Sequence, residues 1–224
     1  MDISPTTARR INRAAWTMAV LGTVVGQLHA LARFQVHPDD LAASPLARAW
    51  AEPATRILRP LLDWADGWTV YVTYGKVWTT VCLALIAAVY LVYRRRRPGG
   101  PERTLWLVTL AGYVMMTMSV VGEYFTPWTD QMFLVGIAAA LVIAGSGIAL
   151  GSLLLRRGFR PRTTAVLLVL FLPLMVAITT VTSLGSALLP LVWGWALATR
   201  AAVRGEQPDR PGPGPRTEPA VRRT

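Results

Sequence analysis

Four uncharged stretches constrain this chain most, because each is long enough to cross a lipid bilayer. The hydrocarbon core of a bilayer is about 30 Å thick, and an α-helix of about 20 apolar residues spans it. The four stretches cover residues 14–32, 77–93, 104–122 and 132–155, and none contains Asp, Glu, Lys or Arg. The chain is 16% charged, whereas soluble domains carry about 25% charged residues. The sequence therefore predicts an integral membrane protein of the all-α class.

A fifth uncharged segment, residues 163–199, is too long for one comfortable crossing. As a single helix it would measure about 55 Å at 1.5 Å per residue. A polar sequence at 179–186 interrupts it, and a turn there would divide it into spans of about 164–181 and 184–199. We therefore predict six transmembrane helices. Five spans remain the alternative if the segment crosses only once.

The arginine distribution predicts how these spans are oriented. Short cytoplasmic loops accumulate Lys and Arg. Basic clusters lie before the first span (9–13), after the second (94–103), after the fourth (156–162) and after the sixth (200–223). Six spans place all four clusters on one side, so we expect both termini in the cytoplasm. Orientation and lipid-headgroup contacts are assigned to Arg94, Arg95, Arg96, Arg97, Arg156 and Arg157.

The first span also resembles a cleavable signal peptide. Basic residues precede an apolar run that ends in Ala30-Leu31-Ala32, and small residues of this kind mark signal-peptidase sites. We expect the span to be retained because its apolar run is longer than the roughly 7 to 15 residues typical of a signal peptide. Cleavage would instead leave five spans.

Among the segments outside the membrane, some are predicted to be folded and one is predicted to be disordered. Residues 1–13 form a short cytoplasmic N-terminus before the membrane domain at 14–200, and the Pro- and Gly-rich basic tail at 201–224 is expected to be disordered. Within the outer loop at 33–76, apolar residues recur with helical spacing and predict an amphipathic helix at about 53–66. This helix either lies on the outer membrane surface or caps the outer mouth of the bundle.

Six polar residues gather where spans meet the outer surface. Ionisable groups in or near membrane spans are costly and are therefore candidates for function. Together they could form an outward-facing cluster that binds a cation or relays protons through the imidazole. The structural alternative is that they serve a short polar loop or bond to a neighbouring helix. The candidates are Gln27, His29, Glu123, Tyr124, Asp130 and Gln131.

Several kinds of site are disfavoured by what the sequence lacks. Its two histidines, His29 and His37, would lie about 12 Å apart along one helix, so one chain cannot hold a haem between them. The lone Cys82 and the absence of clustered ligands argue against a metal site. Enzyme signature motifs are absent. We expect no cofactor and no nucleic-acid partner, since orientation already explains the arginine runs.

Small residues indicate close helix packing in two spans. Gly22 and Gly26 in the first span, and Gly147 and Gly151 in the fourth, have the spacing that lets helix backbones approach closely. We expect these faces to pack within the chain. Homodimerisation through one of them is a second hypothesis.

The leading functional hypothesis is a non-enzymatic, multi-pass protein of a bacterial plasma membrane. It would organise the membrane or bind a partner, either a second copy or another membrane protein. The bacterial origin is inferred from a composition rich in Arg, Ala, Gly and Pro. The first alternative is a small-solute or proton-coupled transporter that uses the outward-facing cluster. The second alternative is a membrane enzyme that acts on a lipid or envelope substrate.

Overall fold

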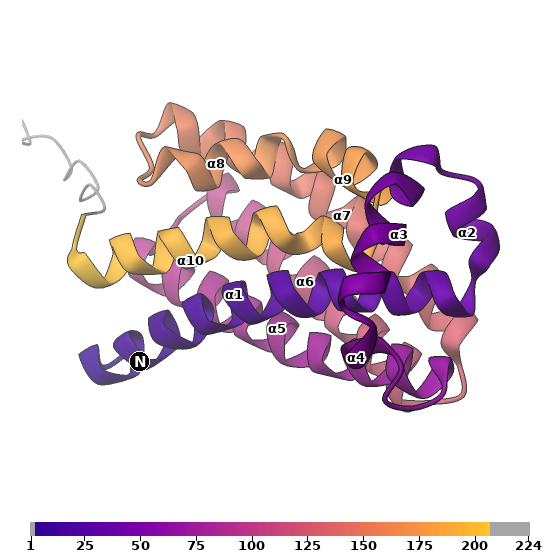
Figure 1. Cartoon of the computed structure of the whole chain (residues 1–224). Coiled ribbons are helices and arrows are strands. Elements are labelled where there is room, and N and C mark those ends of the chain that lie inside the picture. Colours follow the sequence, from indigo (N-terminus) through magenta and orange to yellow (C-terminus); the bar gives the residue numbers. More distant parts are fainter. Residues whose placement is uncertain (1–2, 207–224) are drawn as a thin grey trace, which may run out of the picture.

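In the computed structural model, residues 3–206 are described, and they fold into α-helices and one short 3-10 helix packed side by side (Figure 1). No strand occurs within residues 3–206. The expected disordered tail lies largely outside this range, although its first residues continue the last helix. The elements are α1 (Pro5–Val36), α2 (Pro38–Ala42), α3 (Pro45–Ile57), α4 (Arg59–Leu62), α5 (Gly67–Arg96), α6 (Pro101–Phe125), α7 (Thr129–Arg156), α8 (Arg162–Val169), α9 (Phe171–Thr179), η1 (Gly185–Leu188) and α10 (Leu189–Arg204).

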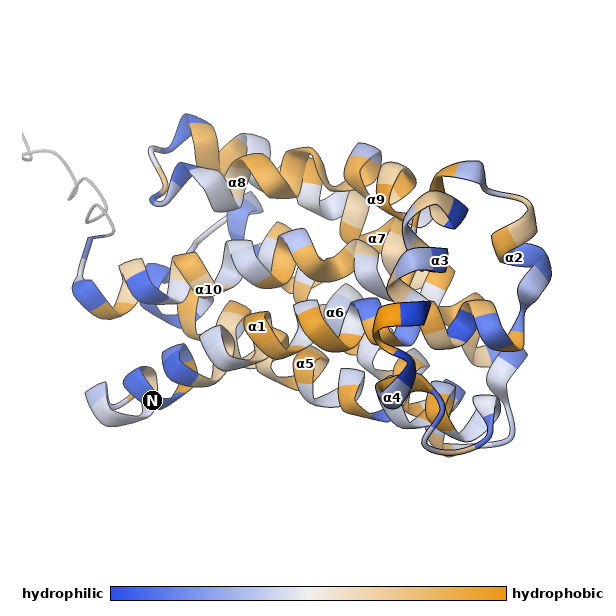
Figure 2. Cartoon of the chain, in the orientation of Figure 1, coloured by the Kyte–Doolittle hydropathy of each residue, from blue (hydrophilic) through white to orange (hydrophobic). Residues whose placement is uncertain are grey.

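Five helices are long and apolar enough to cross a membrane. They are α1, α5, α6, α7 and the continuous helix that η1 and α10 form over Gly185–Arg204. In Figure 2, apolar residues run along the middle of the bundle and hydrophilic residues gather at its two ends. The prediction of an all-α chain with membrane-spanning helices is therefore confirmed at this level.

The segment 163–199 is broken rather than continuous. Helices α8 and α9 together pass the same test of length and composition, but they are bent by 64° at Leu170, which makes them either a broken span or a re-entrant loop. The bend has a local cause, because Pro173 has no N–H to donate to the carbonyl group of Val169. The structure thus has five helices that qualify as spans, or six with this pair.

Two helix connections, the start of α1 and the end of α10 lie at one end of the bundle, which we call the arginine end. It comprises residues 9–13, 94–103, 156–162 and 200–204. A hydrogen bond of 2.9 Å from Thr199 Oγ1 to Asn12 Oδ1 joins the end of α10 to the start of α1. The ends of these two helices lie together at the left of Figure 1. The basic clusters that are far apart in sequence therefore share one end of the molecule.

The opposite end, the capped end, is covered by α2, α3 and α4 (Figure 1). Here the structure differs from the single helix expected at 53–66. The Ser44 hydroxyl accepts a hydrogen bond from the N–H of Ala47 at 3.2 Å and starts α3 earlier, and α3 continues through Pro53. The helix then stops at Leu58, because Pro60 cannot donate to the carbonyl group of Arg56.

Helix α3 closes the mouth of the bundle where the backbone between α9 and η1 is irregular. Ser44 Oγ donates a hydrogen bond of 2.7 Å to the carbonyl oxygen of Thr180, and Trp50 Nε1 donates one of 2.8 Å to that of Val181. These side-chain donors satisfy backbone carbonyl groups that have no partner within a helix. One face of α3 is thus a cap, with Ala47 and Ala51 buried.

The four glycines expected to pack helices all lie in contacts within the chain. A Cβ atom on Gly22 would lie 2.8 Å from the Trp78 ring, and one on Gly26 would lie 3.5 Å from Ser186 Oγ. On α7, a Cβ on Gly151 would lie 2.6 Å from the carbonyl oxygen of Ala165 in α8, and Gly147 faces the backbone of α8 in the same way. Gly22 lets α1 approach α5, Gly26 faces η1, and the two glycines of α7 let it approach α8.

Candidate functional site

A hydrogen-bonded polar cluster joins α1, α5 and α6 near the capped end. His29 Nε2 lies 2.8 Å from the hydroxyl of Tyr124. The hydroxyl of Tyr71 lies 3.4 Å from that of Tyr124 and donates a hydrogen bond of 3.3 Å to Glu123 Oε1. We call these four residues the outer cluster. They form a continuous chain of exchangeable protons from an imidazole to a carboxylate.

The local sequence of α5 positions this cluster. Asp66 caps the helix by accepting a hydrogen bond of 3.0 Å from the N–H of Thr69, and this contact lowers the pKa of the Asp66 carboxyl group. The helix therefore starts well before residue 77, and Tyr71 stacks on the His29 ring with centroids 4.7 Å apart. One turn later, Gly75 leaves room for Tyr124, whose ring would overlap a Cβ atom at this position.

A small cavity adjoins the outer cluster. Its free space is about 40 Å³, which is room for about three water molecules or one small ion and for no larger solute. The indole N–H of Trp78, which also lines the cavity, has no hydrogen-bond partner among the described residues. Polar groups from α1, α5, α6 and the 183–185 segment therefore face one small space. The polar lining comprises His29, Arg33, Trp78, Ser119, Glu123, Tyr124 and Ser183.

The structure separates the six candidate residues into two sets. His29, Glu123 and Tyr124 are brought together at the cavity. Gln27 is half-buried on α1, and Asp130 and Gln131 are exposed in the first turn of α7; these three do not line the cavity. Asp130 and Gln131 lie in the first turn of α7, directly after a short connection, and there they face outward. Their closeness in sequence to Glu123 therefore did not predict a shared site.

Tyr71 of the outer cluster and Arg33 of the adjoining cavity each carry only a weak sequence signal. Tyr71 lies before the uncharged stretch at 77–93, so it falls outside the span drawn from hydropathy. Arg33 follows the first uncharged stretch directly and is easily assigned to the loop. The N-cap sequence Asp66-Gly67-Trp68-Thr69 is the signal that would have extended α5 and included Tyr71.

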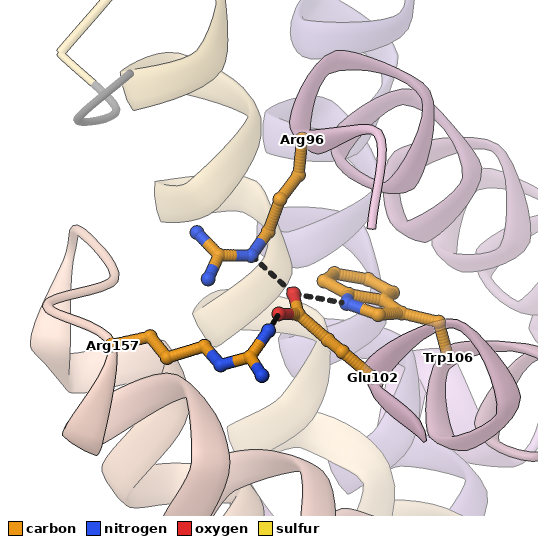
Figure 3. Close-up of polar contacts among 4 residues, drawn as sticks. All are labelled: Arg96, Glu102, Trp106 and Arg157. Carbon is orange, nitrogen blue, oxygen red and sulfur yellow. Dashed lines mark hydrogen bonds and ion pairs between the residues drawn. The ribbon is translucent and has the colours of Figure 1, made fainter. Parts of the chain in front are cut away.

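A second buried polar group lies at the arginine end, where Glu102 binds two arginines. Figure 3 shows Arg96 and Arg157 pointing at the Glu102 carboxylate, to which Arg96 Nε and an Arg157 guanidinium nitrogen both donate. Trp106 Nε1 also donates to Glu102 Oε1, at 3.3 Å. Glu102 is only 2% exposed. We call Arg96, Glu102 and Arg157 the Glu102 clasp.

The Glu102 clasp ties three helix ends together and leaves its carboxylate fully engaged. Arg96 ends α5, Glu102 begins α6, and Arg157 follows α7. Both carboxylate oxygens accept hydrogen bonds from cations, an arrangement that favours a fixed structural contact over a binding site. Sequence reasoning missed Glu102, although it is the one acidic residue among the arginines at 94–103 and precedes Trp106 by one helical turn.

Neither a metal site nor a known relative identifies the role of these two clusters. Within residues 3–206, no group of three His, Cys, Asp or Glu side chains is placed to hold a metal ion. Models of known protein families, curated proteins and solved structures gave no match to this chain.

Proposed function

We propose that the chain is a multi-pass protein of a bacterial plasma membrane, with six crossings and both termini in the cytoplasm. In this arrangement α8 and α9 together form the fifth crossing. The gathering of the basic clusters at the arginine end supports this orientation, because arginine-rich connections stay on the cytoplasmic side.

Topology reporters test this placement. Fusions after residues 97 and 206 should both report a cytoplasmic position, and a fusion after residue 128, in the connection between α6 and α7, should report the opposite side. If the fusions after 97 and 206 report opposite sides, the six-span arrangement is wrong.

The protein works, in our proposal, by binding a partner at its capped end and without catalysing a reaction. The observation that carries this proposal is the exposed apolar surface of the outer loop. Ile57 is 77% exposed, and Leu61, Trp64 and Trp68 are about half exposed. Exposed aromatic and aliphatic side chains of this kind are typical of protein or membrane contacts. The outer loop thus caps the bundle with one face and presents an apolar face elsewhere.

The interior supports binding over catalysis. The Glu102 carboxylate is held by two arginines, and the outer cluster adjoins a cavity of only about 40 Å³. An organic substrate does not fit beside His29 and Glu123 in this conformation. The partner is then either a second copy of the chain or another membrane protein.

Affinity purification from native membranes tests the partner proposal. The double variant Ile57→Ser and Trp64→Ser should lose a protein that the unchanged chain recovers. Leu46→Ser, which alters an exposed leucine at the other end of α3, is the matched control and should retain it. Reproducible recovery of neither a partner nor a homo-oligomer by the unchanged chain would contradict the proposal.

A second candidate function is a proton-coupled carrier or proton relay, and the outer cluster specifically favours it. The chain of contacts from His29 through Tyr124 and Tyr71 to Glu123 provides groups that exchange protons, beside a cavity with room for water. Helices can pack together without an imidazole, two hydroxyl groups and a carboxylate in one hydrogen-bonded chain.

Glu123→Gln tests this candidate against a matched acidic neighbour. In proteoliposomes, the variant should abolish proton flux or proton-driven uptake, whereas Asp130→Asn, which alters an exposed residue outside the cavity, should leave it unchanged. Equal flux in both variants and in His29→Ala would exclude the relay.

A further inference from the structure

An open groove lined by arginines lies at the arginine end, in the connection between α5 and α6. Its volume is about 390 Å³, which is nearly ten times the free space beside the outer cluster. Most of its lining is basic or aromatic. The lining residues are Tyr93, Arg94, Arg97, Pro98 and Arg103.

This groove is distinct from the Glu102 clasp. Arg96 and Arg157 point at the Glu102 carboxylate, whereas Arg94, Arg97 and Arg103 line the groove. The arginines at this end therefore fall into two groups: Arg96 and Arg157 bind the buried Glu102, and a different set lines the groove. The backbone adds to the positive potential, because α6 starts beside the groove and its N-cap residue, Gly100, has no side chain to cap the helix.

Exposed apolar side chains continue from the groove along both helices. On α5, Tyr90 lies one turn before Arg94, whose guanidinium carbon is 6.0 Å from the Tyr90 ring centroid, and exposed Leu83 lies two turns further. On α6, exposed Leu107 lies one turn after Arg103. A cationic groove that leads into two apolar helix faces matches an amphiphile with an anionic head and a hydrocarbon tail.

We propose that this groove binds an anionic phospholipid from the leaflet that faces the arginine end. The arginine forks donate to the phosphate oxygens, because a planar guanidinium matches an oxyanion in geometry and charge. Tyr93 borders the phosphate at the level where aromatic side chains favour the membrane interface. The acyl chains lie along the faces of Leu83 and Leu107. This inference rests on the membrane placement proposed above and is independent of the partner at the capped end.

Native mass spectrometry of the full chain tests the proposal. The protein is reconstituted in nanodiscs of equal parts phosphatidylglycerol and phosphatidylcholine and then released, and the bound lipids are counted. The unchanged chain should retain phosphatidylglycerol in preference to phosphatidylcholine. The triple variant Arg94→Gln, Arg97→Gln and Arg103→Gln should retain at least about tenfold less phosphatidylglycerol, since each basic residue near an anionic surface contributes to lipid attraction.

A matched variant distinguishes a site from general attraction. Arg9→Gln, Arg10→Gln and Arg13→Gln remove the same number of positive charges from the same end of the bundle and should leave retention unchanged. Arg103→Gln alone should give an intermediate loss and serves as the second variant if the triple variant does not fold, which circular dichroism would reveal.

Three outcomes would overturn the proposal. Equal loss in both triple variants would show non-specific attraction, and equal retention of phosphatidylcholine would show that the headgroup charge is not recognised. Tight binding of inorganic phosphate alone to the detergent-solubilised chain, abolished by the groove variant and undisturbed by added phosphatidylglycerol, would assign the groove to free phosphate. Reporter fusions test the membrane placement separately, so a wrong placement can be distinguished from a wrong lipid site.

Discussion

Each end of the bundle holds a glutamate away from open solvent, Glu102 fully buried and Glu123 half-buried, and the surroundings of the two carboxylates differ. At the arginine end, Glu102 is 2% exposed and both of its oxygens accept from guanidinium groups. At the capped end, Glu123 accepts from the neutral hydroxyl of Tyr71 and borders a cavity shared with Arg33. One carboxylate is thus neutralised by direct ion pairs, and the other keeps room beside it.

This difference assigns different roles to similar residues. A carboxylate that is closed off by two cations fixes helix ends, because removing the carboxylate leaves two positive charges unpaired. A carboxylate that meets hydroxyl groups and a water-sized space can change its protonation or its partner. The Glu102 carboxylate is therefore fixed by its two ion pairs, whereas the Glu123 carboxylate has a hydroxyl group and free space beside it.

The largest effect should come from removing the carboxylate of the Glu102 clasp. Glu102→Ala leaves Arg96 and Arg157 facing each other without an anion, and we expect the free energy of unfolding to fall by about 3 kcal/mol. Equilibrium unfolding of the full chain in SDS and mixed micelles measures this change. A loss below about 1 kcal/mol, the range of surface ion pairs, would remove the contrast between the two ends.

Adding one methyl group at the capped end should be the next most damaging change. The Cβ atom of Gly75→Ala would overlap the Tyr124 ring, and we expect a loss of about 2 kcal/mol in the same unfolding measurement. The control is Gly145→Ala on α7, where a Cβ atom meets no neighbour within 4 Å. Gly145→Ala should be neutral or stabilising, because Ala favours a helix over Gly. A control variant that loses as much stability as Gly75→Ala would show that overlap with the Tyr124 ring is not the cause.

Removing a single hydroxyl from the outer cluster should cost less. Tyr124→Phe deprives His29 Nε2 and the Tyr71 hydroxyl of their shared partner, with an expected loss of about 1 kcal/mol. Tyr90→Phe, at an exposed tyrosine of α5, is the control and should be neutral. Unchanged stability in Tyr124→Phe would mean that water replaces the hydroxyl, which would sharpen the case for a hydrated cavity.

The smallest effect should follow from removing Arg157, the more exposed of the two arginines that bind Glu102. The Arg157 side chain is 44% exposed, so water screens its ion pair, and Arg157→Gln should cost less than about 1 kcal/mol. Arg96→Gln should cost more because Arg96 is mostly buried. The reverse order in SDS unfolding would show that burial does not set the strength of the clasp.

Sequence alone predicts the long apolar helices because a membrane span needs only length and the absence of charge. The uncharged stretches at 14–32 and 132–155 lie within α1 and α7 for this reason. Helix ends follow from local capping, and hydropathy does not record it. Asp66 thus starts α5 before the stretch at 77–93, and Pro60 divides the helix expected at 53–66.

The candidate site is only half predictable for a related reason. A polar residue near a span end is visible in the sequence, which identifies His29 and Glu123. The helix face on which it lies depends on packing, so Asp130 looks equivalent to Glu123 and yet faces outward. Pairings such as Arg157 with Glu102 join residues 55 positions apart, and no local pattern specifies them.

The hydrogen bonds from α3 to the backbone at 180–181 have a consequence for biosynthesis. Ser44 and Thr180 are 136 positions apart, so a ribosome releases the cap long before it makes the segment that the cap serves. During the interval, the indole nitrogen of Trp50 must remain with water or with a temporary partner such as an insertion factor. The last loop to be synthesised then locks the first one in place, and an arrested chain that ends before Thr180 should leave the outer loop open to proteases.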